Sequence, residues 1–308
     1  MNRRVALGLV GASLGMLRAR PARAADAMRV AAPALDATAL VFYANDENYF
    51  KNAGLPVDVQ AMANGEAVTL AIAGGAVDVG CSEVVSLILA FHKGIPITLI
   101  AAGGEQAPKA AVGMLFARNG LAVTTGADFT GKTIAVVGLN GFAQYGTQLW
   151  IDKNGGDSKR VKFVQFAGAQ IGVALQDGRV DGAFVPEPFV SAVKKVARPV
   201  ANSMAAIAPQ FLSSAHFTTV PYAKAHADEI RKFQSALHQA ADWANAHTDQ
   251  TAVILERVAR VAPAVVAASV RAHFGDTLEA SSVQPLIDMA AKYGNFPSFS
   301  ANDLIYRA

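Results

Sequence analysis

The sequence contains a single cysteine, Cys81, among its 308 residues. One cysteine cannot form an internal disulfide, so packing must stabilise the fold, with Cys81 as a small buried side chain. The cysteine pair or close histidine and carboxylate set of a metal site is also missing, so we expect no metal and no cofactor. H-E-x-x-H does not occur either, which argues against a zinc hydrolase of that class.

Basic residues are concentrated at the N-terminus. Arg3 and Arg4 precede the apolar stretch Val5–Leu17, and a small-residue A-x-A run ends at Ala24. This order predicts a signal peptide over residues 1–24, cleaved after the A-x-A run. A membrane span needs about 20 apolar residues, and this stretch is shorter. The general and the twin-arginine export routes both stay open, and no cysteine follows that could accept a lipid anchor.

Without that leader the chain is slightly acidic. The whole sequence has 27 Lys and Arg residues against 24 Asp and Glu residues. Five of the arginines and none of the acids fall within residues 1–24, which leaves 22 against 24 and a net charge of −2. Nucleic-acid binding needs a basic surface that neutralises phosphates, so we expect no nucleic-acid partner.

Three short segments of the first half recur in the second half at nearly one offset. The pairs, 104, 105 and 103 positions apart, are Met28–Ala32 with Lys132–Val136, Val57–Gln60 with Lys162–Gln165, and Gly75–Asp78 with Gly178–Asp181. Each half therefore alternates strand and helix, which predicts βαβ units and a mainly parallel sheet. Two similar α/β halves indicate two lobes with a cleft between them.

Apolar spacing and glycine stops place the helices. We expect helices at Asp36–Ala53, Glu66–Ala73, Glu83–His92, Phe142–Lys153 and Ala169–Gln176. Beyond about residue 221, an apolar stripe at helical spacing predicts a helical tail. Ligands of open α/β sheets bind beyond the carboxyl ends of the strands, near helix N-termini. The loops that we expect at the cleft are 32–36, 80–83, 101–105, 138–145 and 183–189.

Several segments resemble a known family. Asn48–Leu55 is similar to the GYFKKEGL segment of the nitrate/sulfonate/taurine-type, or NMT1-like, periplasmic solute-binding proteins, and Ala71–Gly80 is similar to their ALASGEVDFG. Lys93–Ile97, Asp128–Val136 and Gln176–Pro188 resemble the KGAPV, DLKGKKIAV and SGEVDAAVVWEP segments of the same family.

This resemblance implies a type II periplasmic binding protein fold, with two α/β lobes around a ligand cleft and a helical C-terminal tail. It implies lobe 1 at 25–112 plus 218–308 and lobe 2 at 113–217. It also implies a monomeric periplasmic protein, not an enzyme, that delivers a small solute to an inner-membrane ABC permease with a cytoplasmic ATPase. The cysteine-rich motif of a fold relative that makes a thiamine pyrimidine is missing. A periplasmic sensor or another enzyme on this fold is the alternative.

Ser82 and Glu83 lie where the family places a polar group for its ligand, so both are candidate contacts. The alternative is local: Ser82 caps the following helix, and Glu83 is a first-turn acid favoured by the helix dipole.

The loop at 138–145 departs from the family pattern. Relatives that bind oxyanions often read GSTxH here, whereas this chain has Asn140, Gly141 and Phe142. The helix amides remain, the hydroxyls are lost, and an aromatic ring is gained. This change favours an organic solute with a face to pack, with Phe142 as a core residue being the alternative.

Glu187 lies between two prolines at the expected edge of lobe 2. A buried carboxylate needs a donor or a cation, supplied either by a ligand nitrogen or by an internal Lys or Arg. Asp36 and His216 are further candidates, with a helix cap and a hinge-strand histidine as their alternatives. We therefore expect a small organic solute with a donor or cationic nitrogen. The alternative is a sulfonate or another small oxyanion, including a sulfonate that carries an amine.

Overall fold

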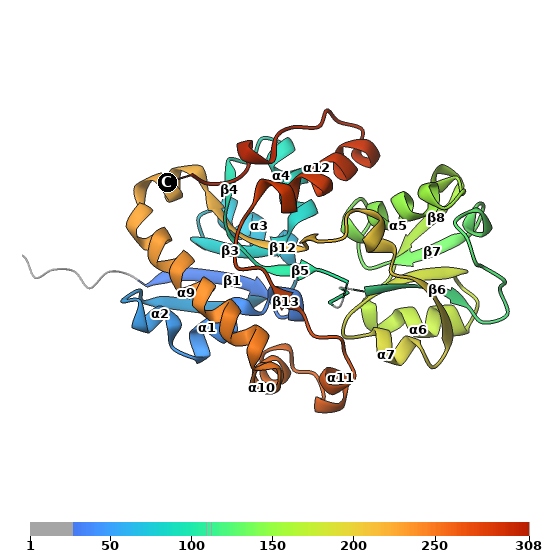
Figure 1. Cartoon of the computed structure of the whole chain (residues 1–308), viewed down its shortest axis with the longest axis horizontal. Helices are drawn as coiled ribbons and strands as arrows, with labels where there is room; N and C mark the ends of the chain where they lie inside the picture. The colour runs from blue at the N-terminus through green and yellow to red at the C-terminus, as the bar shows by residue number, and fades with distance from the viewer. Residues whose placement is uncertain (1–26, 109, 112, 308) are drawn as a thin grey trace, which may run out of the picture.

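The computed structural model describes residues 27–108, 110, 111 and 113–307, so the expected leader at 1–24 lies outside the described residues. Figure 1 shows two α/β bodies side by side, each built around its own five-stranded sheet. Over the described residues, no helix combines the length and the apolar character that crossing a membrane requires.

The first sheet has the strand order β2-β1-β3-β12-β4. In that order the strands are Val57–Met62, Met28–Pro33, Val79–Glu83, Ser214–Thr219 and Ile97–Ala102. β1 pairs in parallel with β2 and β3, whereas β12 runs antiparallel between β3 and β4. β12 thus returns from the second half of the chain, and the expected boundary between residues 217 and 218 falls within it.

The second sheet repeats this plan in the order β10-β6-β9-β7-β8. Its strands, in that order, are Ala197–Ala201, Gly113–Arg118, Gly182–Pro186, Thr133–Val136 and Lys162–Gln165. β7 pairs in parallel with β8 and β9, and β6 runs antiparallel between β9 and β10. The prediction of two mainly parallel α/β halves is confirmed, with one reversed strand in each sheet.

The repeat extends to single hydrogen bonds. The Asp78 carboxylate accepts the backbone N–H of Arg29 at 2.8 Å, and the Asp78 N–H donates to the Arg29 carbonyl at 2.9 Å. Asp181 makes the same two contacts with Thr133 at 3.0 and 2.8 Å. Each aspartate therefore ties the start of the third strand of its half to the first strand. This contact gives a physical reason for the Val-Asp pair that recurs 103 positions later.

The helices of the two halves lie where the sequence places them, with one break. α3 (Gly65–Ala73), α4 (Val84–His92), α5 (Phe142–Lys153) and α6 (Gly168–Gln176) cover the expected segments. The single helix expected at Asp36–Ala53 is wrong. A 3-10 turn at Asp36–Thr38 precedes α1 (Leu40–Asp46) and α2 (Tyr49–Asn52). The break falls at Asn48, whose φ of 61° is left-handed, a conformation that asparagine tolerates better than most residues.

The capping role expected for Ser82 is also wrong. β3 continues through Glu83, which pairs with Ser214 on β12, so Ser82 is a strand residue. Its buried hydroxyl faces the start of α3, where a Cβ added at Gly65 would lie 2.0 Å from the Ser82 Oγ. Glu83 itself occupies the N-cap position of α4, with no side-chain cap.

The C-terminal residues form helices, as expected: α8 (Val220–Ala225), α9 (Ala227–Ala246), α10 (Thr248–Ala259), α11 (Pro263–Ala267) and α12 (Ala280–Gly294). α9 packs on α1 and α2, where the rings of Phe233 and Phe50 stack with centroids 5.2 Å apart. α12 packs on α4 and reaches α5 of the other half, where the Tyr293 hydroxyl donates to Asp152 at 2.7 Å. A small sheet, in the order β11 (Phe211–Leu212), β5 (Gly104–Gln106) and β13 (His273–Phe274), joins the tail to the first half.

Candidate functional site

A cavity of about 80 Å³ lies between the two halves of the molecule. This volume is several times the roughly 10–15 Å³ that one buried water requires. The residues that follow β1, β3, β7 and β9 contribute to its wall, together with the segment that leads to β13. The cavity therefore lies at the carboxyl ends of the parallel strands, where open α/β sheets bind their ligands.

One wall of the cavity is aromatic and apolar. Phe142, the first residue of α5, is buried against Phe184 and Phe211, with ring centroids 6.4 and 6.0 Å away in edge-to-face geometry. Phe142 and Phe184 both line the cavity, so Phe142 is at once a core residue and a wall residue. The N-cap of α5 is Gly141, which offers no side chain to the amides of the first turn. Those amides carry the positive end of the helix dipole to the cavity edge.

Each half of the chain contributes a glutamate to the cavity. Glu83 is the last residue of β3, and Glu187 follows β9 directly, 104 positions later. This spacing is nearly the offset of the internal repeat, so the two carboxylates occupy similar places in the two halves. Both line the cavity, and none of the described residues that line it is a Lys, an Arg or a His.

The two glutamate carboxylates have few hydrogen-bond donors among the described residues. No residue in the described part of the chain donates a hydrogen bond to the Glu83 carboxylate. Glu83 lines the cavity with its side chain exposed, and the surrounding protein atoms nevertheless raise the pKa of its carboxyl. Burial likewise raises the pKa of Glu187, helped by the Asp36 charge and opposed by the Val270 N–H, the Lys194 charge and the Val190 N–H. Glu187 accepts the Val270 N–H through Oε1 at 3.1 Å, while its buried Oε2 has no partner among the described residues.

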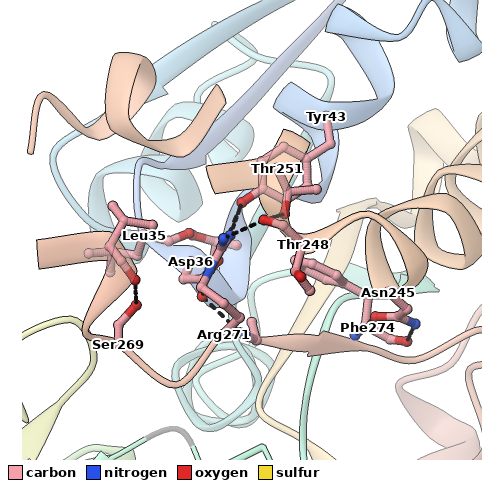
Figure 2. A network of polar contacts seen from close by, with 12 residues as sticks. Leu35, Asp36, Tyr43, Asn245, Thr248, Thr251, Ser269, Arg271 and Phe274 are labelled. Carbon is pink, nitrogen blue, oxygen red and sulfur yellow. Dashed lines mark hydrogen bonds and ion pairs between the residues drawn. The ribbon is translucent and has the colours of Figure 1, made fainter. Parts of the chain in front are cut away.

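Asp36 also lines the cavity, but its carboxylate is fully engaged inside the protein. Arg271 donates to both oxygens, from Nε to Oδ2 at 3.0 Å and from Nη2 to Oδ1 at 2.8 Å. The Ala272 N–H donates to Oδ2 at 2.8 Å, and the Tyr43 hydroxyl approaches Oδ1 at 3.3 Å. Figure 2 shows Asp36 and Arg271 facing each other in this network. With Asp36 only 6% exposed, its bonding capacity is directed to the protein rather than to a ligand.

Four further candidates lie outside the cavity wall. Ser82 faces α3, Gly141 caps α5, and Asn140 is exposed at the turn before α5, with its N–H donating to Gln144 at 2.8 Å. His216 is buried on β12 with Nδ1 2.8 Å from the Ala102 carbonyl, and burial lowers the pKa of His216 to about 4. The structure therefore brings together Asp36, Glu83, Phe142 and Glu187 of the eight candidates. Within the described part of the chain, no cluster of His, Cys, Asp and Glu suits a metal ion.

Two features of the cavity wall escaped the sequence analysis, namely its residues from the tail and the pairing of its two glutamates. Val270 and Ala272 come from the tail, in which no motif marks them, and only folding brings them to the cavity. The pairing of Glu83 with Glu187 had a signal in the sequence, because their spacing of 104 matches the repeat.

Comparison with known proteins places the chain in a family. The model of the family described as NMT1/THI5 like matches residues 37–251, which is more than half of the chain. The chain belongs to the NMT1/THI5-like family. No curated protein matches the sequence.

Solved structures show the fold of this NMT1/THI5-like protein. The alkanesulfonate-binding protein SsuA of Xanthomonas axonopodis pv. citri, bound to MOPS, is 19% identical with a TM-score of 0.72, covering 91% of this chain and 98% of its own. The periplasmic aliphatic sulphonate-binding protein SsuA of Escherichia coli is 16% identical with a TM-score of 0.76, covering 91% and 92%. The periplasmic nitrate-binding protein NrtA of Synechocystis PCC 6803 is 14% identical with a TM-score of 0.63, covering 78% and 68%. The expected periplasmic binding protein fold, with its two lobes and helical tail, is confirmed.

Proposed function

We propose that this NMT1/THI5-like protein is the solute-binding component of an ABC importer. It captures a small organic solute with a cationic or donor nitrogen between two lobes. The observation that carries this proposal is the pair Glu83 and Glu187, one from each half, which line one cavity without a Lys, Arg or His among the described wall residues. Residues 25–112 plus 218–308 act as one lobe, and residues 113–217 act as the other.

The chemistry of the solute follows from what the cavity leaves unsatisfied. Glu187 Oε2 is buried without a partner among the described residues, which is unfavourable, and an ammonium or ring N–H on the solute supplies the missing donor. Phe142 and Phe184 present an apolar surface beside the two carboxylates, which suits an apolar or aromatic body. A solute held by Glu83 and Glu187 together contacts both halves at once, so its binding favours the closed arrangement of the lobes.

Export and partners follow from the same proposal. The leader pattern at 1–24 supports export to the periplasm, and two of the similar structures are described as periplasmic. The protein acts there as a monomer. An inner-membrane permease with a cytoplasmic ATPase is the partner that accepts the solute.

A sulfonate is the second candidate solute, and one feature favours it. The first turn of α5 borders the cavity without a side-chain cap, which is an arrangement that attracts anions. A similar structure is described as an alkanesulfonate-binding protein bound to MOPS. A sulfonate that also carries an amine would satisfy both the α5 amides and the glutamates.

Binding without catalysis is part of the proposal. The sole cysteine, Cys81, lies within β3 and is not among the residues that line the cavity. Burial raises the pKa of Cys81 to about 12, so the thiol stays protonated at neutral pH and is a poor nucleophile.

The test uses matched pairs of probes that differ only in the nitrogen. Benzylamine against benzyl alcohol isolates the cation on an apolar body, and taurine against isethionate isolates it on a sulfonate. We expect the amine of at least one pair to bind to the mature protein in calorimetry and to raise its melting temperature by mass action. Small-angle scattering should then show compaction. Native mass spectrometry of freshly purified protein should show a nitrogen-containing solute whose mass stays unchanged on incubation.

Two variants test whether Glu83 and Glu187 are the residues that distinguish an amine from its hydroxyl analogue. Glu83→Gln and Glu187→Gln keep the shape but remove the charge, and a charge-assisted hydrogen bond is worth about 1.5–3 kcal/mol. Each variant should therefore weaken the binding of the amine about ten- to a hundredfold while leaving the hydroxyl analogue unchanged. Glu66→Gln, an exposed glutamate on α3, is the matched control. Tighter binding of isethionate than of taurine, with no effect of either variant, would favour the oxyanion alternative.

A further inference from the structure

The segment between α11 and β13 crosses from the first-half side of the cavity to Glu187. Val270 and Ala272 of this segment line the cavity, and the Val270 N–H donates to Glu187 Oε1 at 3.1 Å. Val270 belongs to the tail that packs on the first half, whereas Glu187 follows β9 of the second sheet. This hydrogen bond therefore joins the two halves directly, between two residues that line the cavity.

The segment is held in place by Asp36. The guanidinium of Arg271 lies against both oxygens of Asp36, and the next backbone amide, that of Ala272, donates to the same carboxylate. Arg271 also donates through Nη1 to the Thr248 carbonyl at 3.1 Å, which holds the other side of the guanidinium group in place (Figure 2). The side chains of Arg271 and Asp36 are 15% and 6% exposed, so water screens this pair little.

Fixing Arg271 and Ala272 also fixes the residue before them. Val270 cannot move its N–H far when the next two residues are bonded to Asp36 through side chain and backbone. The Val270 N–H then occupies one oxygen of Glu187 and sets the orientation of the carboxylate. The other oxygen, Oε2, is buried without a partner among the described residues. It is the group that remains to accept a donor from a solute.

We infer that Asp36 is a positioning residue for the binding site and not a ligand contact. Asp36, acting through Arg271 and Ala272, holds the Val270 N–H as the first-half part of a latch whose second-half part is Glu187. The latch forms only when the two halves approach, and it presents Glu187 Oε2 in the bound geometry. The consequence for solute recognition rests on the proposed function. The latch itself is a property of the protein without solute.

The latch can be tested without any solute, by amide hydrogen exchange of the full mature chain followed residue by residue with NMR. We expect the Val270 amide to exchange on the order of tenfold faster in Glu187→Ala and in Asp36→Asn than in the wild type, because each variant removes a hydrogen bond to a charged group. The double variant should exchange no faster than the faster single variant, since both substitutions break one chain of contacts. Asp78→Asn, in the Asp78–Arg29 pair of the same half, is the control and should leave Val270 unchanged.

Three results would overturn the inference. Equal exchange of the Val270 amide in the wild type and in Glu187→Ala would show that no latch exists. Unchanged Val270 exchange in Asp36→Asn, despite a lower melting temperature, would make Asp36 a structural residue only. Effects that multiply in the double variant would make the two residues independent. If Asp36→Asn does not fold, Arg271→Lys provides the same test, because lysine keeps the charge but loses the two-pronged contact. None of these outcomes depends on which solute the protein binds.

Discussion

The two halves of the chain share a strand order and an aspartate contact, yet the same position serves different ends in each. Asp36 follows β1, and Asn140 follows β7 at the offset of 104 that relates those strands. The tail brings Arg271 against Asp36, which becomes a buried ion pair. Asn140 meets no such partner among the described residues and stays exposed, with its N–H bonded to Gln144 of the helix that follows. What packs against a position, more than its place in the repeat, decides its role.

The ends of β3 and β9, the third strands of the two halves, show the opposite, because equivalent positions there keep a similar role. Glu83 and Glu187 both line one cavity, because they lie at the carboxyl ends of β3 and β9. Their charges are not neutralised by described neighbours at the wall, whereas the charge of Asp36 is. A fully paired carboxylate supports the scaffold, and an unpaired one beside a cavity is available for a ligand.

The largest expected effect concerns the shared aspartate contact. Asp78→Ala removes both the acceptor for the Arg29 N–H and the partner of its guanidinium, and should lower the free energy of unfolding by about 2–3 kcal/mol. Asp181→Ala loses the bond to the Thr133 N–H and only a 3.6 Å contact with Arg118, so a loss of about 1–2 kcal/mol is expected. Urea unfolding measures both, and the Asn variants separate the charge from the backbone bond. Equal losses would mean that the guanidinium of Arg29 adds nothing.

The next effect is a pH dependence of stability that distinguishes β12 from β6, the antiparallel strands of the two sheets. His216 lies on β12, while Met114–Ala117 of β6 contains no titratable residue. Because burial lowers the pKa of His216 from 6.5 to about 4, the unfolded chain takes up the proton first as pH falls. Stability present at pH 7 is therefore lost between about pH 6.5 and pH 4, by about 2–3 kcal/mol.

His216→Asn keeps a donor for the Ala102 carbonyl and removes this titration. Its stability should therefore change less between pH 7 and pH 4.5 than that of the wild type, as followed by urea unfolding. If the two proteins lose the same stability on acidification, His216 is not the group responsible.

The smallest expected effect is a gain. Burial raises the pKa values of Glu83 and Glu187, so the folded protein without solute keeps their protons to higher pH than the unfolded chain does. Stability from these groups is therefore full below the ordinary value of 4.5 and falls as pH rises through the raised values. Glu83→Gln and Glu187→Gln should raise the melting temperature by a few degrees at pH 7, and this gain should shrink at acidic pH.

The same exposed control, Glu66→Gln, should show little change at either pH. A lower melting temperature in both cavity variants at pH 7 would indicate that the carboxylates already have internal partners.

The site could be predicted only in part, because some of its contacts join residues that are far apart in the sequence. Glu83, Phe142 and Glu187 line the cavity, and the sequence could point to them because each ends or follows a recognisable strand or opens a helix, and the carboxyl ends of strands converge by geometry. Their contact with a ligand stays a prediction. Ser82 was misplaced because β12, more than 130 positions away, extends β3 through Glu83 by pairing with it. The role of Asp36 depends on Arg271, 235 positions away, and no local pattern announces that contact.

By itself the sequence determined the repeated strand and helix order, because hydrophobic patterning and glycine stops act locally, and it fixed two equivalent acids at one offset. Only the tertiary structure decided which acid would be neutralised. The folded tail delivers Arg271 to Asp36 in the first half and the Val270 N–H to Glu187 in the second half. Charge pairing depends on distances of a few ångströms between residues far apart in the chain, and such distances exist only after folding.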